Sequence, residues 1–82
     1  GEFLAAPAQT TRHTEEFYRS VGEKIKLIRK QKGLTQKAVA QRLKVSQQII
    51  SRIETGRENL SLRSLKNIAA ALDCQLQVDI FG

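Results

Sequence analysis

The chain has 82 residues, of which 14 are Lys or Arg and 8 are Asp or Glu, so its formal net charge is +6. This length allows one small domain with a marginal core, which oligomerisation would help to stabilise. The positive charge favours a polyanionic partner. No apolar run could span a bilayer, no helical pattern has a basic face opposite a broad apolar one, and no secretion signal opens the chain. We therefore expect no membrane partner.

The residues that most often carry chemistry are scarce. Cys74 is the only cysteine, which excludes an internal disulfide and any metal site that needs two cysteines. It fits a reducing compartment, so we expect a cytoplasmic, nucleoid-associated protein. His13 is the only histidine, and the five glycines are scattered, so neither a catalytic set nor a phosphate-binding loop can be assembled. We therefore predict that the protein is not an enzyme and has no metal or cofactor.

The first residues show no periodicity. Residues 1–13, which include Ala5-Ala6-Pro7-Ala8, are interpreted as a flexible arm or a remnant of cloning. A compact domain would then cover residues 14–74, and residues 75–82 would form a terminal segment.

A helical pattern covers residues 14–32. Thr14 is a plausible N-cap, and Gly33 is expected to end the helix in the left-handed conformation. Gly22 should weaken the first turns by about 1 kcal/mol relative to alanine, so the helix could begin late. Four apolar residues recur at helical spacing along this stretch: Phe17, Val21, Ile25 and Ile28.

Two short helical patterns follow, over residues 36–43 and 47–54, with almost no connection between them. Thr35 is the candidate N-cap of the first and Ser46 that of the second. Helices joined so closely should cross at a steep angle, as in a helix-turn-helix. Lys44 in the turn is expected to adopt the left-handed conformation, at a cost of about 1 kcal/mol.

The helix over residues 47–54 has two different faces at 100° per residue. The apolar face carries Ile49, Ile50 and Ile53, of which Ile49 lies at the edge and could belong to the core or touch a thymine methyl group. The opposite face carries two amides, a hydroxyl and a guanidinium: Gln47, Gln48, Ser51 and Arg52. Glutamine pairs with adenine and arginine with guanine. An ordinary solvated face is the alternative, but pattern, spacing and charge together favour contacts with bases.

The remaining residues predict one more helix and a strand. Gly56 should cap the preceding helix, and Ser61 should open the last one. Its core stripe would consist of Leu62, Leu65, Ile68, Ala69 and Leu72. Polar and apolar residues then alternate over 75–81, which is strand periodicity. A single strand leaves its backbone groups unpaired, so we expect the same strand of a second copy to pair with it, burying Leu76, Val78 and Ile80. A frayed terminus is the alternative.

These elements together resemble the Cro/phage-repressor (XRE-type) helix-turn-helix family over about residues 21–72. The resemblance is carried by Gly33-Leu34-Thr35-Gln36, by Leu43-Lys44-Val45-Ser46-Gln47-Gln48 and by Ile50-Ser51-Arg52-Ile53-Glu54-Thr55-Gly56. It implies that Gln47, Gln48 and Arg52 read bases and that Ser51 contacts a base or a phosphate. It also implies phosphate contacts from Thr35, Gln36, Ser46 and Arg57.

The resemblance also assigns roles within the fold. A glutamine at the position of Gln36 braces the first residue of the recognition helix, here Gln47. Arg29 should serve the fold more than the DNA, and Glu54 should be a structural partner for the loop that follows it. The fold class expected is mainly α, a compact four-helix helix-turn-helix domain with one C-terminal strand that pairs across a homodimer.

The function expected is a sequence-specific regulator of transcription, acting as a repressor. A homodimer would bind double-stranded DNA on an inverted repeat, with the helix over 47–54 in the major groove. One alternative is a DNA-binding antitoxin that also neutralises a toxin protein, because some antitoxin-type members end in a similar strand. Another is a protein-binding adaptor that does not read DNA, although such a protein would not need glutamines and arginine on one face.

Overall fold

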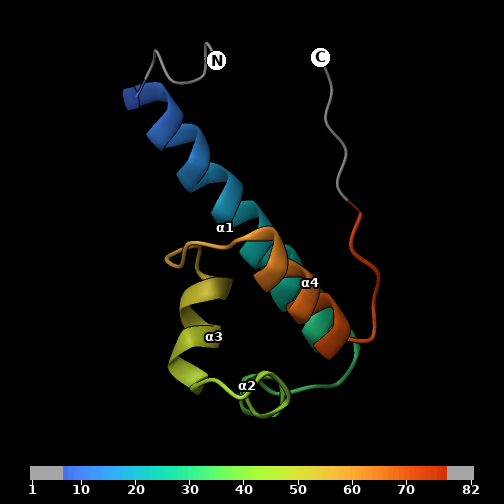
Figure 1. Ribbon diagram of the computed structural model, residues 1–82. Helices are drawn as coiled ribbons and strands as arrows, with labels where there is room; N and C mark the ends of the chain where they lie inside the picture. Colours follow the sequence, from blue (N-terminus) through green and yellow to red (C-terminus); the bar gives the residue numbers. More distant parts are fainter. Residues whose placement is uncertain (1–6, 78–82) are drawn as a thin grey trace.

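The computed structural model describes residues 7–77, and its side chains from residue 15 onward. It is a bundle of four helices, as expected (Figure 1). Their bounds are Pro7–Gln31 for α1, Gln36–Leu43 for α2, Gln47–Glu54 for α3 and Leu62–Ala71 for α4. Within the described residues, no helix is both long and apolar enough to cross a membrane.

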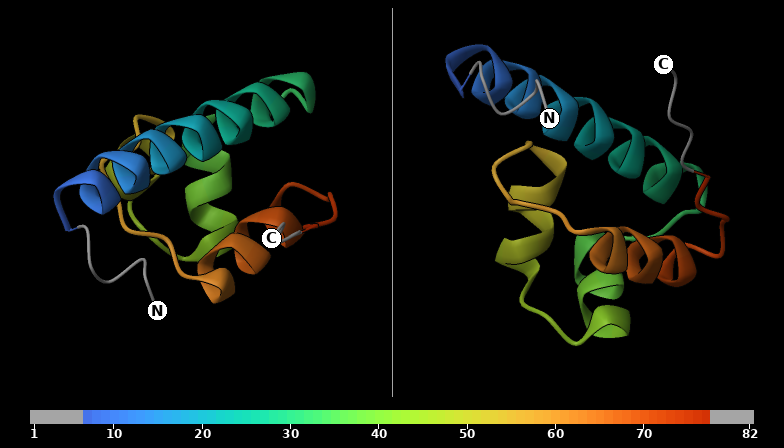
Figure 2. Two further views of the ribbon diagram at one scale, coloured as in Figure 1. Left: turned by 90° about the horizontal axis from the view of Figure 1, so that it is seen from above. Right: turned by 45° about the horizontal axis from the view of Figure 1, so that its top comes forward.

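Helix α1 begins at Pro7, and the expected start at Thr14 is wrong. Residues 7–13, which we assigned to a flexible arm, are helical, and Thr14 lies inside the helix. Proline is favoured in the first helical turn, where its missing N–H has no partner to lose. Once a helix has nucleated against a core, each further residue adds one hydrogen bond, so the helix extends without apolar periodicity. This first half of α1 projects beyond the other helices (Figure 2). Residues 1–6 lie outside the described range.

Three of the four predicted N-caps are confirmed, and Thr14 is the exception. The hydroxyl oxygens of Thr35, Ser46 and Ser61 each accept a hydrogen bond from the backbone N–H three residues further on, at 3.0, 3.3 and 3.1 Å. Helices α2 and α3 therefore begin where their sequences place them, and they cross steeply (Figure 1).

All four helices end in the same backbone arrangement. In each, a residue with positive φ follows the helix, and the next N–H donates to a carbonyl five residues earlier, at 2.8 to 3.0 Å. The residues with positive φ are Gly33, Lys44, Gly56 and Asp73. The left-handed Lys44 is thus confirmed, with φ of 60°, and it shortens the turn between α2 and α3 at a cost of about 1 kcal/mol.

The core draws residues from all four helices. Its buried members are Ile25, Val39, Ala40, Ile50, Ile53, Ile68 and Leu72. Leu62 was expected in the core stripe of α4, but it is 64% exposed, because it lies in the first turn of that helix, on the side that faces solvent. Leu65 packs against the core from its edge.

Two glycines let α1 approach α3 and the loop that follows it. A Cβ atom at Gly22 would overlap the carbonyl oxygen of Ile53, and one at Gly56 would lie 2.6 Å from the Cα of Arg19. Gly22 therefore does not mark a frayed helix start. It marks the point where the backbones of α1 and α3 meet.

A buried ion pair fixes the same interface. The Nε and Nη2 atoms of Arg29 donate to the two carboxylate oxygens of Glu54, at 2.6 and 3.1 Å. Arg29 also donates through Nη1 to the carbonyl of Leu34, at 2.8 Å. The prediction that Arg29 serves the fold is confirmed. Glu54 is structural as expected, but it pairs with α1 and not with the loop that follows α3.

The end of the described chain carries no strand. Residues 74–77 are irregular, and Val78 and Ile80 lie outside the described range. The pairing of this segment with a second copy therefore stays a prediction.

Candidate nucleic-acid interface

Helix α3 presents its polar side chains to solvent, except for Glu54 at its C-terminal end, which is buried. The four residues expected to face DNA from this helix are all exposed: Gln47, Gln48, Ser51 and Arg52. On the opposite side, Ile50 and Ile53 are 2% and 5% exposed. Ile49 is half-buried and packs against the core, which leaves part of its side chain accessible. The structure therefore brings two amides, a hydroxyl and a guanidinium onto one accessible face of α3. The opposite face of this helix is anchored in the core.

The N-termini of α2 and α3 carry the two predicted hydroxyl contacts. Thr35 and Ser46 are both exposed, although each uses its hydroxyl oxygen as a cap. A hydroxyl group has one donor in addition to its acceptor positions, so capping leaves its O–H free to donate to a phosphate oxygen. Backbone N–H groups at a helix N-terminus add to the attraction for anions.

Gln36 has a different partner from the one expected. Its Nε2 atom donates to Oε1 of Glu54, at 3.0 Å, and it is not bonded to Gln47. The bracing role is therefore wrong, because Glu54 already stands beside the N-terminus of α2 and offers a stronger acceptor than an amide. An amide nitrogen carries a second N–H, so a phosphate contact from Gln36 stays a prediction.

Arg52 is held by the loop that follows α3. Its Nε donates to Oε1 of Glu58 at 2.9 Å, and its Nη2 donates to the backbone carbonyl of Arg57 at 3.1 Å. The side chain remains 56% exposed. Sequence analysis did not single out Glu58. The signal available was a carboxylate in the exit loop, six residues beyond an arginine predicted to read a base.

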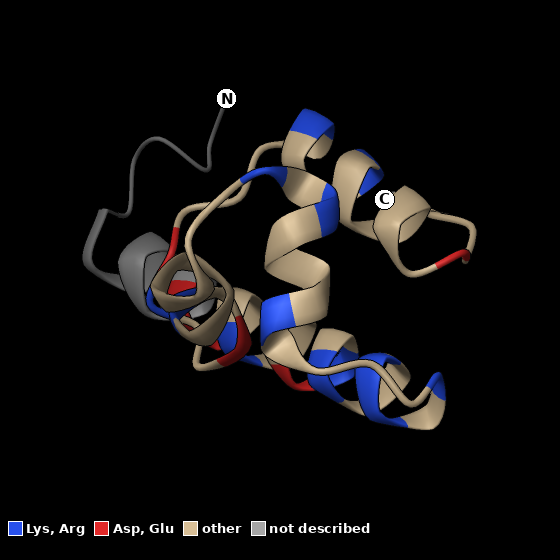
Figure 3. Ribbon diagram, turned by 90° about the horizontal axis from the view of Figure 1, so that it is seen from below, with Lys and Arg blue, Asp and Glu red and all other residues tan. Residues whose placement is uncertain are grey.

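Exposed basic residues lie on the elements next to α3, although Arg42 donates to the carbonyl of Ala71 at the end of α4. Lys37, Arg42 and Lys44 on α2 and its turn are exposed, as is Arg57 in the exit loop. Seen from below, Lys and Arg positions are spread along α2 and along α1 (Figure 3). Charges of one sign near a recognition helix raise affinity for phosphates without choosing a sequence.

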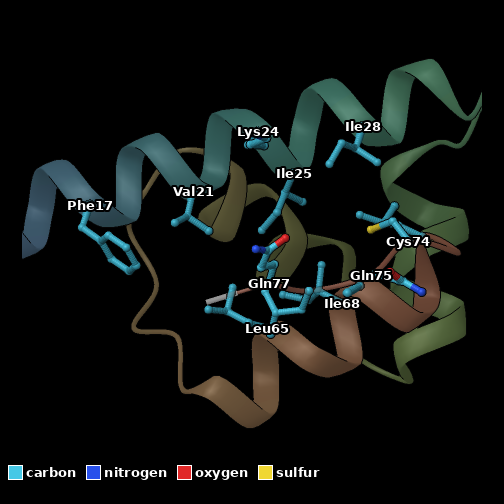
Figure 4. Close-up of a pocket in the computed structure, with 13 residues that line it drawn as sticks. Phe17, Val21, Lys24, Ile25, Ile28, Leu65, Ile68, Cys74, Gln75 and Gln77 are labelled. Atoms are coloured by element: carbon cyan, nitrogen blue, oxygen red, sulfur yellow. The ribbon is translucent and has the colours of Figure 1, made fainter. Parts of the chain in front are cut away.

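A second feature lies on another side of the molecule. An apolar groove of about 460 Å³ runs between α1 and α4 and is bordered by the chain after α4 (Figure 4). Phe17 at one end is 55% exposed, and Leu76 in the tail is 40% exposed. Among the described residues, no group of three or more His, Cys, Asp or Glu side chains could hold a metal ion.

The fold and the exposed face of α3 define a helix-turn-helix domain, and comparison with known proteins agrees. The model of a helix-turn-helix family matches residues 25–78, which is more than half of the chain. The chain belongs to this XRE-type family of DNA-binding regulators.

One relative is a phage protein. Over 57 residues the chain is 40% identical to the immunity repressor protein of Bacillus phage phi105. The aligned part is 70% of this chain and 40% of that repressor, so the chain spans less than half of its relative's length.

Proposed function

We propose that the protein binds a specific sequence of double-stranded DNA and represses transcription. The observation that carries this proposal is the arrangement of α3, whose polar face is exposed while Ile50 and Ile53 are buried beneath it. A helix with one anchored face and polar side chains on the other fits the major groove, where each base pair displays a distinct pattern of donors and acceptors.

The residues of the interface divide into two roles. Gln47, Gln48 and Arg52 read base edges, and Ser51 contacts a base or a phosphate. Phosphate contacts come from residues around the helix: Thr35, Gln36, Ser46 and Arg57. The first group sets the sequence, and the second sets affinity and its dependence on salt.

A homodimer on an inverted repeat completes the proposal. Two recognition helices about 34 Å apart would enter successive major grooves. The tail supports this arrangement, because Leu76 is exposed beside the apolar groove between α1 and α4, and apolar residues alternate after it at Val78 and Ile80. Pairing of two tails would bury these side chains and supply partners for their backbone groups. The tail supports the antitoxin alternative, whereas the similarity to an immunity repressor favours repression.

A mobility-shift assay at two salt concentrations tests the proposal. The probe is a duplex enriched by the protein from a random pool, with a shuffled duplex as the control. We expect the enriched duplex to be bound more tightly at both salt concentrations, and both affinities to fall as salt rises. Equal binding of the two duplexes at each concentration would contradict sequence-specific recognition.

A further inference from the structure

The loop after α3 is bonded twice to Arg52. The backbone N–H of Arg57 donates to the carbonyl of Arg52 at 2.8 Å, and the carbonyl of Arg57 accepts from Nη2 of Arg52 at 3.1 Å. This places the next residue, Glu58, where its Oε1 accepts from Nε of Arg52 at 2.9 Å. The backbone of the loop thus sets the position of the carboxylate relative to the guanidinium.

These bonds occupy part of the guanidinium and leave part of it available. A guanidinium has five N–H donors in a rigid plane. One on Nε and one on Nη2 are used, which leaves the two on Nη1 and one on Nη2. Two adjacent donors at the end of the plane suit the O6 and N7 acceptors of guanine. In this arrangement the remaining donors on Nη1 and Nη2 of Arg52 can bond to a base, while Nε and the other Nη2 donor stay bonded to the loop.

The Glu58 carboxylate also disfavours contacts that Arg52 could otherwise make with phosphates. A free arginine on the edge of a DNA-binding face can turn to a phosphate, which adds affinity for any sequence. Glu58 opposes that contact in two ways, because it occupies the Nε edge and because its negative charge repels a phosphate. Its side chain is 31% exposed, so its charge is not hidden from an approaching polyanion.

We infer that Glu58 is a specificity-determining residue, which positions Arg52 for a base and withholds it from phosphates. This inference rests on the proposed function, since it concerns how the same face discriminates between sequences. Glu58 acts through Arg52 and does not itself contact the base. Removing it should weaken binding of the preferred sequence relative to others and strengthen binding of random DNA.

The test compares base preference and salt dependence in four variants of the full chain. The duplex enriched by the unaltered protein is varied one base pair at a time, and Arg52→Ala identifies the position that Arg52 reads. At that position Glu58→Ala should lower the preference at least about fivefold. On random duplex it should bind more tightly, and the slope of log affinity against log salt should steepen by about one unit, as Arg52 gains a phosphate.

The controls separate positioning from general effects of charge or folding. Glu23→Ala removes a carboxylate from an exposed position on α1 and should leave both the preference and the slope unchanged. In the Arg52→Ala background, adding Glu58→Ala should not change the preference at the same position, because the side chain it positions is absent. A merely structural role of Glu58 would weaken binding to all duplexes alike.

The outcomes distinguish this inference from the function on which it rests. If Arg52→Ala relaxes one position but Glu58→Ala keeps the unaltered preference and slope, the inference is wrong and sequence-specific binding stands. If Arg52→Ala relaxes no position, the inference also fails. If the unaltered protein enriches no sequence at all, the proposed function itself is overturned.

Discussion

The protein contains two arginine–glutamate pairs that share their chemistry and differ in their surroundings. Arg29 and Glu54 meet beneath α3, where their side chains are 10% and 2% exposed, whereas Arg52 and Glu58 meet at its outer edge, where they are 56% and 31% exposed. The buried pair joins two helices and has its remaining groups bonded to the protein. The outer pair leaves guanidinium donors directed to solvent. Burial therefore distinguishes a pair that holds α3 against α1 from a pair that leaves part of its arginine accessible at the surface of α3.

The largest expected effect comes from breaking the buried pair. Arg29→Ala leaves the Glu54 carboxylate buried without its cation, which should lower the free energy of unfolding by about 3–5 kcal/mol. Urea denaturation followed by circular dichroism measures this loss. The control is the double substitution Arg29→Met with Glu54→Leu, which removes both charges and should cost less than Arg29→Ala alone. If the single substitution were as stable as the unaltered protein, the pair would not hold α1 against α3.

The next effect concerns the arginine of the outer pair. Arg52→Ala should reduce discrimination at one base pair of the operator by about 1–3 kcal/mol, because a bidentate contact to guanine is lost. Stability should change little, since the side chain is largely exposed. Titration of duplexes that differ at single positions measures the effect. Equal losses on preferred and random DNA would assign Arg52 to phosphate binding instead.

Arg57 provides a comparison within the same loop. Its side chain is exposed, and its backbone N–H and carbonyl are both hydrogen-bonded to Arg52. Arg57→Ala keeps the backbone and removes the cation. We expect weaker binding to all sequences alike, with a salt slope reduced by about one unit. Binding isotherms at four salt concentrations, on enriched and shuffled duplexes, check this. A change restricted to one sequence would show that Arg57 reads a base.

The smallest expected effect is the loss of folding stability when Glu58, the acidic residue of the outer pair, is replaced. Glu58→Ala should change the free energy of unfolding by less than about 1 kcal/mol, because solvent screens an exposed ion pair. The same urea denaturation measures this. A loss as large as that of Arg29→Ala would remove the contrast between the two pairs.

Helix positions and caps could be predicted from local chemistry. Thr35, Ser46 and Ser61 cap through a bond to a backbone group three residues away, so neighbouring residues suffice to locate them. The polar and apolar faces of α3 also followed from spacing alone, because one face of a short helix must meet the core.

Contacts between distant residues could not be predicted in the same way. Gly22 reads as a weak point in a helix, and only the packed structure shows that a side chain there would collide with the backbone of α3. The partners of Gln36 and Arg52 depend on where Glu54 and Glu58 lie in space. The start of α1 was missed because a helix that extends into solvent needs no apolar pattern.

The most direct test of the central claim is a nuclear magnetic resonance titration of the protein with its enriched duplex. Backbone amide shifts at Gln47, Gln48, Ser51 and Arg52 should be the largest, with smaller ones at the N-terminus of α2 and in the exit loop. Shifts concentrated along the groove between α1 and α4, with α3 unchanged, would contradict recognition of DNA by this helix.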